Sequence, residues 1–183
     1  GEKVSGPLHV SLRNRLPWLS VNLITTFLAA LVIGLFESTI AKVVTLAVFL
    51  PIVAGQGGIG GTQTLTLVVR GMVLKEVSGR KSELRLLFRE ISLGALHGLL
   101  MAVIVGVVAY IWKDNYMLGV VLGLAMLGNM LVASLAGAGI PLLLARLKID
   151  PAIASAVIVT TFTDVAGFFL FLGLATLFVK LLI

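Results

Sequence analysis

The chain has 183 residues, of which 59% are hydrophobic and only 12% are charged. Soluble domains are closer to half apolar and a quarter charged, so this composition excludes an ordinary soluble protein and indicates an integral protein of the lipid bilayer. The absence of cysteine excludes disulfides and thiolate metal sites, and two histidines are too few for an imidazole-rich zinc or copper site. The net charge of +6 comes mostly from basic residues between the apolar runs, so we expect a topology signal and no nucleic-acid partner.

Five apolar runs are each long enough to cross a bilayer as a helix, for which about 20 residues suffice. The polar and basic residues 1–15 precede them, and we expect this segment to be a tail or the end of a linker. The five expected spans cover residues 16–36, 39–69, 86–112, 116–144 and 151–180. The sequence therefore predicts an all-α, polytopic membrane protein in which residues 16–183 form one domain of five transmembrane helices.

Lysine and arginine are distributed unequally between the two sides of these spans. Eleven lie in the N-terminal segment, in the connection after span two together with the start of span three, and in the connection after span four, whereas only Lys42, Lys113 and Lys180 belong to the other side. Because positive residues are enriched on the cytoplasmic side, the N-terminus is expected in the cytoplasm and the C-terminus outside. The expected location is the cell membrane.

The second span contains Gly-Gln-Gly-Gly-Ile-Gly-Gly at residues 55–61. Because each glycine costs about 0.8–1 kcal/mol relative to alanine within a helix, this stretch disfavours a continuous helix. A broken backbone at membrane depth is tolerated next to protein or water, where its carbonyl oxygens become ligands for cations or their water shells. Close helix packing through glycine is the alternative. The candidate pore-lining residues of this stretch are Gly55, Gly57, Gly58, Gly61 and Thr62.

Small residues also recur at helical spacing in spans three and four. Pairs separated by four residues, which favour close helix contacts, occur at Gly94 and Gly98 and at Gly119 and Gly123. On span four, Asn129 and Ala133 belong to one small, weakly polar face and are further candidates for lining a pore. Glu37, at the end of span one, is either a surface acid near the membrane interface or part of a pore mouth.

Asp164 is the only acidic residue that the sequence places deep inside an apolar span. An ionised carboxylate at that depth costs roughly 2.5–3.5 kcal/mol on insertion scales, which makes it a candidate functional residue. Helical spacing places it on one face with Ala156, Thr160, Thr163 and Gly167, as expected for a helix that lines a narrow aqueous path. An acid that fixes helix packing is the alternative. Since an aspartyl hydrolase needs two carboxylates at one site, we do not expect an enzyme.

A lone carboxylate offers one negative charge and two oxygen ligands, which hard cations prefer. Mg²⁺ sheds its water reluctantly and is often held through one or two carboxylates. Two copies of the chain related by a twofold axis, the commonest symmetry of homo-oligomers, would bring two Asp164 carboxylates to one axial site and balance a divalent charge. We therefore expect a homodimer with a pore between its two copies.

Several short motifs occur along the chain: Arg-Leu-Pro-Trp-Leu at 15–19, Phe36-Glu37, Leu-Pro-Ile-Val-Ala-Gly-Gln-Gly-Gly at 50–58, Gly-Thr-Gln at 61–63, Val-Arg-Gly at 69–71, Arg89-Glu90, Asp150-Pro151 and Thr-Thr-Phe-Thr-Asp-Val-Ala-Gly-Phe-Phe at 160–169. Together they resemble the transmembrane domain of the MgtE magnesium channel and transporter family over about residues 14–182. The resemblance implies a homodimer of five-helix chains around a magnesium-selective pore, lined chiefly by spans two and five. It also implies that Asp164 binds hydrated Mg²⁺ and that the glycine-rich stretch lies beside the ion path.

Two departures from the family pattern matter. Ile59 stands where the family usually has an asparagine, which removes a polar group from the glycine motif. Family members also usually carry cytosolic N-terminal and CBS domains that sense magnesium, and these are not among the 183 residues, so they are expected only if the full-length protein is longer. The expected function is magnesium permeation, with Mg²⁺ as the transported ion. A magnesium exchanger coupled to sodium or protons and a non-conducting membrane scaffold are the alternatives.

Overall fold

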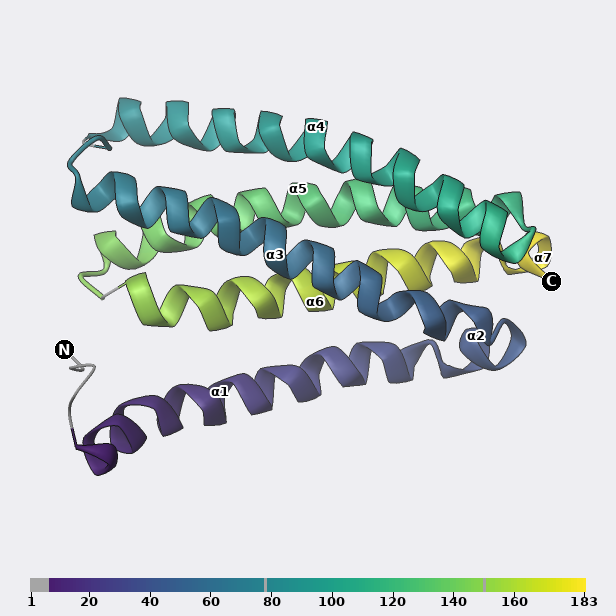
Figure 1. Cartoon of the computed structure of the whole chain (residues 1–183), viewed down its shortest axis with the longest axis horizontal. Helices are drawn as coiled ribbons and strands as arrows, with labels where there is room; N and C mark the ends of the chain where they lie inside the picture. The colour runs from purple at the N-terminus through teal and green to yellow at the C-terminus, as the bar shows by residue number, and fades with distance from the viewer. Residues whose placement is uncertain (1–6, 78, 150) are drawn as a thin grey trace.

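The computed structural model describes residues 7–77, 79–149 and 151–183, and within these ranges every regular element is a helix (Figure 1). The long helices are α1 (Leu8–Leu35), α3 (Thr45–Val73), α4 (Arg80–Lys113), α5 (Tyr116–Arg146) and α6 (Pro151–Leu177), and the short ones are α2 (Glu37–Lys42) and α7 (Val179–Leu182). Five helices in the described chain are long and apolar enough to cross a membrane. The predicted all-α fold with five spans is confirmed, and the chain is a multi-pass membrane protein.

The helix boundaries differ from the expected spans at the N-terminal side of the fold. α1 already begins at Leu8, inside the segment expected to be a tail. The second span begins at Thr45 rather than near residue 39, because the separate short helix α2 reverses the chain after α1. Val43, with φ −129° and ψ 73°, leaves the helical region and ends α2.

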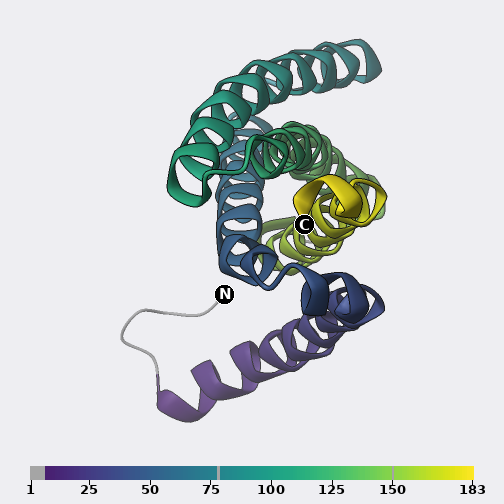
Figure 2. The same cartoon turned by 90° about the vertical axis from the view of Figure 1, so that its right-hand side faces the viewer.

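α5 is the central helix of the fold. It packs against α3, α4 and α6, and 61% of its most apolar stretch is buried, compared with 6% for α1 and 11% for α4. Figure 2 shows α1 and α4 at opposite ends of the arrangement, with α3, α5 and α6 between them. α1 contacts the other long helices mainly through α6. Large parts of α1 and α4 therefore face lipid or another chain.

The apolar core is concentrated toward the end of the molecule that carries α2 and α7. Phe49, Leu122 and Phe171 are fully buried there, and the Phe49 ring meets Trp112 edge to face with centroids 5.6 Å apart. A smaller cluster around Val68 lies toward the other end of α3. The central region of the bundle, between these two clusters, holds the polar side chains described below.

Glycine and other small residues let α4 and α5 approach closely. A Cβ atom added at Gly106 would lie 2.8 Å from the carbonyl oxygen of Gly119, and one added at Gly123 would lie 3.0 Å from that of Ala102. At Gly98 the added atom would lie 3.1 Å from the carbonyl oxygen of Leu127. The predicted close contacts through small residues in spans three and four are therefore confirmed.

The prediction that the glycine-rich stretch breaks the second span is wrong, because α3 is a continuous helix from Thr45 to Val73. The alternative, close packing through glycine, holds for one side of this helix. Added Cβ atoms would lie 2.9 Å from Asn129 Cγ at Gly57, 2.9 Å from Met130 at Gly60 and 2.6 Å from Val159 at Gly61. Tertiary packing at these positions thus overrides the weak helix propensity of glycine.

Candidate cation site

Asp164 lies near the middle of α6, and its side chain is partly exposed. It makes no hydrogen bond or ion pair with any other residue that the structure describes. Thr160 and Thr161, about one turn earlier, donate to backbone carbonyls of their own helix at 3.0 and 2.7 Å. The described part of the chain therefore leaves the carboxylate uncompensated, so at membrane depth it needs water, a cation or another chain.

The neighbours of α6 show where Asp164 is directed. Gly167 packs on Val53 of α3, where an added Cβ would lie 2.9 Å from Val53 Cγ1. Phe169 contacts Phe36, at the end of α1, with ring centroids 5.8 Å apart. At about 100° per residue, Asp164 lies about 60° to one side of Gly167 and about 140° from Phe169. Asp164 is thus on the side of α6 between its contact with α3 at Gly167 and its contact with the end of α1 at Phe169.

Asn129 links three helices in the central region. It is fully buried on α5, and its Nδ2 donates to the backbone oxygen of Val53 on α3 at 2.9 Å. Gly57 of α3 and Gly167 of α6 leave the space that its amide occupies, since a Cβ at either position would lie 2.9 Å from Asn129 Cγ. Its Oδ1 is buried and accepts no hydrogen bond from the described residues. Asn129 therefore fixes α3 against α6 behind Asp164.

The structure divides the candidate pore-lining residues into two groups. Six are buried against neighbouring helices: Gly57, Gly61, Asn129, Ala133, Thr163 and Gly167. The others are exposed or partly exposed: Gly55, Gly58, Thr62, Ala156, Thr160 and Asp164 itself. The buried group forms contacts between α3, α5 and α6, and the exposed group borders the surface of the protomer.

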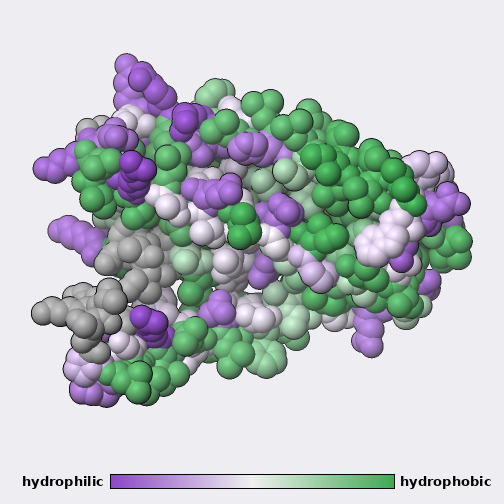
Figure 3. All heavy atoms as spheres, viewed as in Figure 1, coloured by the Kyte–Doolittle hydropathy of each residue, from purple (hydrophilic) through white to green (hydrophobic). Residues whose placement is uncertain are grey.

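The outer face of α3 is unusually polar for a helix at membrane depth. Gln56, Thr62, Gln63 and Thr66 are exposed there, around the apolar Ile59. The Thr62 and Thr66 hydroxyls both donate to carbonyls of α3 itself at 2.8 Å. Figure 3 shows polar residues across the middle of this side of the molecule, on which α3 lies in front. Polar side chains in a membrane normally face protein or water, and no described residue of the chain covers this face.

Comparison with known proteins identifies the family of this five-helix membrane protein. The family model MgtE, described as a divalent cation transporter, matches residues 50–174, from α3 to α6. The chain belongs to the MgtE family. This confirms the resemblance drawn from the motifs of the sequence.

Curated MgtE proteins match nearly all of this chain. It is 36% identical over 171 residues to the magnesium transporter MgtE of Bacillus subtilis, a match that covers 93% of this chain and 38% of the relative. It is 34% identical over 180 residues to the magnesium transporter MgtE of Enterococcus faecalis, a match that covers 98% of this chain and 39% of the relative. It is 31% identical over 176 residues to the magnesium transporter MgtE of Thermus thermophilus, and this match covers 96% of this chain and 38% of the relative. The MgtE-family chain thus spans about two fifths of the length of these relatives.

Glu37, the candidate pore-mouth residue, is not brought close to Asp164. It is exposed at the start of α2, whose Thr39 shares a hydrogen bond of 2.8 Å with Thr176 of α6. Thr176 follows Asp164 by twelve residues, which is about 18 Å along a helix axis. Glu37 therefore belongs to one end of the bundle and Asp164 to its middle.

The structure reveals a buried acid, Glu90, that the sequence prediction missed. The Glu90 side chain of α4 is only 5% exposed, although it lies near the start of the expected third span and not deep inside it. Its sequence neighbourhood is strongly charged, which hides it among surface residues. The available signal was spacing, because Glu90 precedes Gly94 and Gly98 at intervals of four and shares their buried face.

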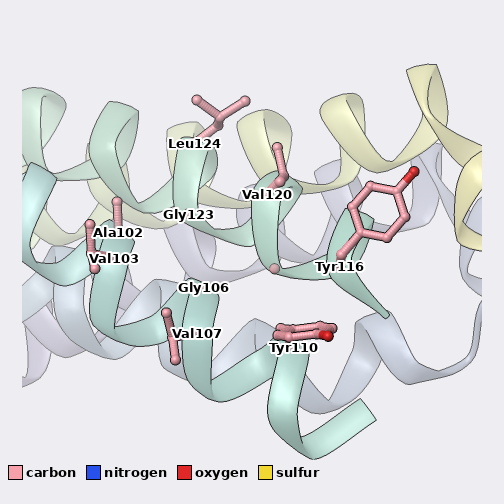
Figure 4. Close-up of a pocket in the computed structure, with 10 residues that line it drawn as sticks. Ala102, Val103, Gly106, Val107, Tyr110, Tyr116, Val120, Gly123 and Leu124 are labelled. Carbon is pink, nitrogen blue, oxygen red and sulfur yellow. The ribbon is translucent and has the colours of Figure 1, made fainter. Parts of the chain in front are cut away.

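A separate groove between α4 and α5 does not resemble an ion site. It has a volume of about 430 Å³ and lies along the close contact of Gly106 with α5 (Figure 4). Val103, Val107, Val120 and Leu124 border it, and Tyr110 and Tyr116 stand at one end. An apolar lining of this kind offers no oxygen ligands for a desolvated cation.

Proposed function

We propose that this chain forms the ion-conducting part of a magnesium channel or transporter, and that Asp164 binds hydrated Mg²⁺ between two copies of the chain. The observation that carries the proposal is the uncompensated Asp164 carboxylate, on the side of α6 between its contacts with α3 and α1, beside the exposed polar face of α3. The name shared by the relatives, magnesium transporter, supports the choice of ion.

In the proposed dimer the two polar α3 faces and the two Asp164 carboxylates approach a twofold axis. Two carboxylates balance the charge of Mg²⁺, and the ion keeps most of its water because it dehydrates reluctantly. Gly55, Gly58, Thr62 and Thr160 are available beside the path, where glycine leaves room for a hydrated ion. The buried candidates such as Gly57 and Gly61 then support the path from behind.

The proposed topology follows from the charge distribution. The N-terminus and the basic connection between α3 and α4 lie on the cytoplasmic side of the cell membrane, and the C-terminus lies outside. The relatives are much longer than this chain, so cytosolic regulatory domains in a full-length protein are part of the proposal. Those domains would control the path, whereas the ion site itself would lie in the helices described above.

Proteoliposomes containing a magnesium-sensitive dye test the ion site. Asp164→Asn is expected to reduce magnesium uptake at least about tenfold, because it removes one carboxylate charge per chain. Asp114→Asn is the matched control, since Asp114 is exposed and has a left-handed backbone conformation that asparagine tolerates. Unchanged magnesium uptake by a correctly folded Asp164→Asn variant would contradict the proposed ion site at Asp164.

The same liposomes distinguish the proposed function from its alternatives. Magnesium uptake driven by its own gradient, with no sodium or proton gradient, supports a channel. Uptake only in the presence of one of those gradients supports an exchanger. Absence of uptake of any divalent ion by correctly folded wild-type chain contradicts both transport mechanisms and favours a scaffold.

Cysteine cross-linking tests the proposed dimer, because the chain has no cysteine of its own. Ile59→Cys, on the outer face of α3, is expected to form a disulfide between two copies in the membrane. Val103→Cys on α4 is the control, because Ile59 and Val103 are equally exposed, at 59% each. Equal cross-linking at both positions, or none at Ile59→Cys, would contradict an interface built on α3.

A further inference from the structure

A half-enclosed cavity of about 260 Å³ lies between α3, α4 and α5, away from Asp164. Its polar lining comes from all three helices: Gln63 and Thr64 of α3, Glu90 and His97 of α4, and Ser134 of α5. Since a water molecule takes about 30 Å³ of liquid, the cavity has room for about eight waters or for an ion with part of its hydration shell. We propose that this cavity is a second cation site, which binds a monovalent alkali ion.

Glu90 supplies the negative charge of the proposed site. Its Oε1 accepts a hydrogen bond of 2.8 Å from Arg89, whose side chain is 60% exposed and approaches from outside. Its Oε2 faces only the Thr64 hydroxyl, at 3.5 Å, which is the outer limit of a hydrogen bond. One oxygen of a buried carboxylate is therefore weakly satisfied by protein, a costly arrangement that a cation would relieve.

The other groups around the cavity supply neutral ligands. The Ser134 hydroxyl makes no hydrogen bond with the described part of the chain, although the residue is 95% buried (5% exposed) and held against Gly94 of α4. Gln63 adds a side-chain carbonyl at the rim. Carboxylate, hydroxyl and amide oxygens are ligands for hard cations. The described residues hold no group of three His, Asp or Glu side chains, so a transition-metal site does not fit.

Charge selects a monovalent ion over a divalent one. Glu90 is the acid of this cavity, and Arg89 already shares its charge. A divalent ion would leave at least one positive charge uncompensated between the helices, whereas a monovalent ion is balanced when the exposed Arg89 side chain turns to solvent. The site thus differs from Asp164, for which a second copy of the chain would supply a second carboxylate.

The cavity is close to the proposed magnesium path, and Gln63 belongs both to its rim and to the exposed polar face of α3. Thr64 follows Gly61 by three residues, about 4.5 Å along the helix, and Gly61 packs on Val159 and Thr163 of α6. An ion that draws Glu90, Thr64 and Ser134 together would tie α3 to α4 and α5. Occupancy of the cavity is therefore expected to stabilise the protein independently of any ion at Asp164.

Thermal unfolding of the purified chain in detergent tests this site. Sodium chloride is titrated against N-methylglucamine chloride at constant ionic strength without magnesium, and the titration is repeated with potassium. Wild type is expected to show a saturable rise in Tm. In Glu90→Gln the half-saturating concentration should increase at least about tenfold, because the negative charge of the site is lost, and in Ser134→Ala about threefold, because one neutral ligand is lost. Asp164→Asn should respond like wild type.

The outcomes separate this site from the proposed magnesium site. No saturable response in wild type to either ion, or an unchanged response in Glu90→Gln, would overturn the second site. If Glu90→Gln does not fold, an unchanged response in both Ser134→Ala and Thr64→Val overturns it equally. A response lost in Asp164→Asn but kept in Glu90→Gln assigns the alkali ion to Asp164 and also overturns the proposal. Magnesium uptake is measured separately, so failure of that function leaves this test intact.

Discussion

Replacing Gly57 with alanine tests whether α3 is held in place through the Asn129 amide. The added Cβ would lie 2.9 Å from Asn129 Cγ and closer still to Nδ2, which donates to the Val53 oxygen. Asn129 cannot retreat toward α6, because Gly167 closes that side. Overpacking costs about 1–3 kcal/mol and loss of the hydrogen bond about 0.5–1.5 kcal/mol, while alanine returns about 0.8–1 kcal/mol of helix propensity. The expected net loss of unfolding free energy is about 2 kcal/mol.

The neighbouring residue provides the control for this prediction. A Cβ added at Gly58 meets no described residue within 4 Å, so Gly58→Ala should be neutral or stabilising by up to about 1 kcal/mol in the isolated protomer. Gly139→Ala is a second control, because a Cβ added at Gly139 also meets no described residue within 4 Å and Gly139 belongs to α5 and not to α3. Equilibrium unfolding in mixed detergent micelles, followed by circular dichroism, measures all three variants. If Gly57→Ala is as stable as Gly139→Ala, the packing interpretation of α3 is refuted.

Three further substitutions test other parts of the fold by the same unfolding assay. Phe171→Ala empties a fully buried position of the larger core and should cost about 3 kcal/mol, so a loss below about 1 kcal/mol would contradict this core. Thr39→Val removes the side-chain hydrogen bond to Thr176 that joins α2 to α6, and the free energy of unfolding is expected to fall by about 1 kcal/mol. An unchanged free energy of unfolding would show that this hydrogen bond contributes nothing to stability. Arg146→Ala breaks the ion pair with Glu83 between α5 and α4. Because the Arg146 side chain is 60% exposed, the expected loss of unfolding free energy is below about 1 kcal/mol. A larger loss would show that Arg146 stabilises the fold through contacts other than this ion pair.

The number of spans could be predicted from the sequence because it depends on apolar length, which is a local property. The sequence wrongly predicted a break in α3, because the continuity of this helix depends on contacts with distant residues and not on a local property. Local propensity counts the cost of each glycine, but the compensation comes from residues such as Asn129 and Val159, which are distant in the sequence. No pattern within residues 55–61 contains that information.

The polar face of α6 shows a second limit of sequence patterns. Helical spacing groups Thr163, Asp164 and Gly167 together, and the structure keeps them on adjacent parts of the helix surface. Yet Thr163 is fully buried and Gly167 packs on Asn129, whereas Asp164 is partly exposed. Periodicity gives the direction of a side chain relative to its own helix, but which neighbour lies in that direction depends on how the helices assemble.

The glycines of α3 are a second feature, besides Asp164, that the proposed partner chain would explain. Gly57 and Gly61 are explained within the protomer, since other side chains fill the space that their missing Cβ atoms leave. Gly55 and Gly58 have no such neighbour among the residues that the structure describes, where nothing comes within 4 Å of a Cβ added at either position. Each still costs the helix about 0.8–1 kcal/mol relative to alanine. In the proposed dimer, close approach of a second α3 or of a hydrated ion would account for glycine at these two positions.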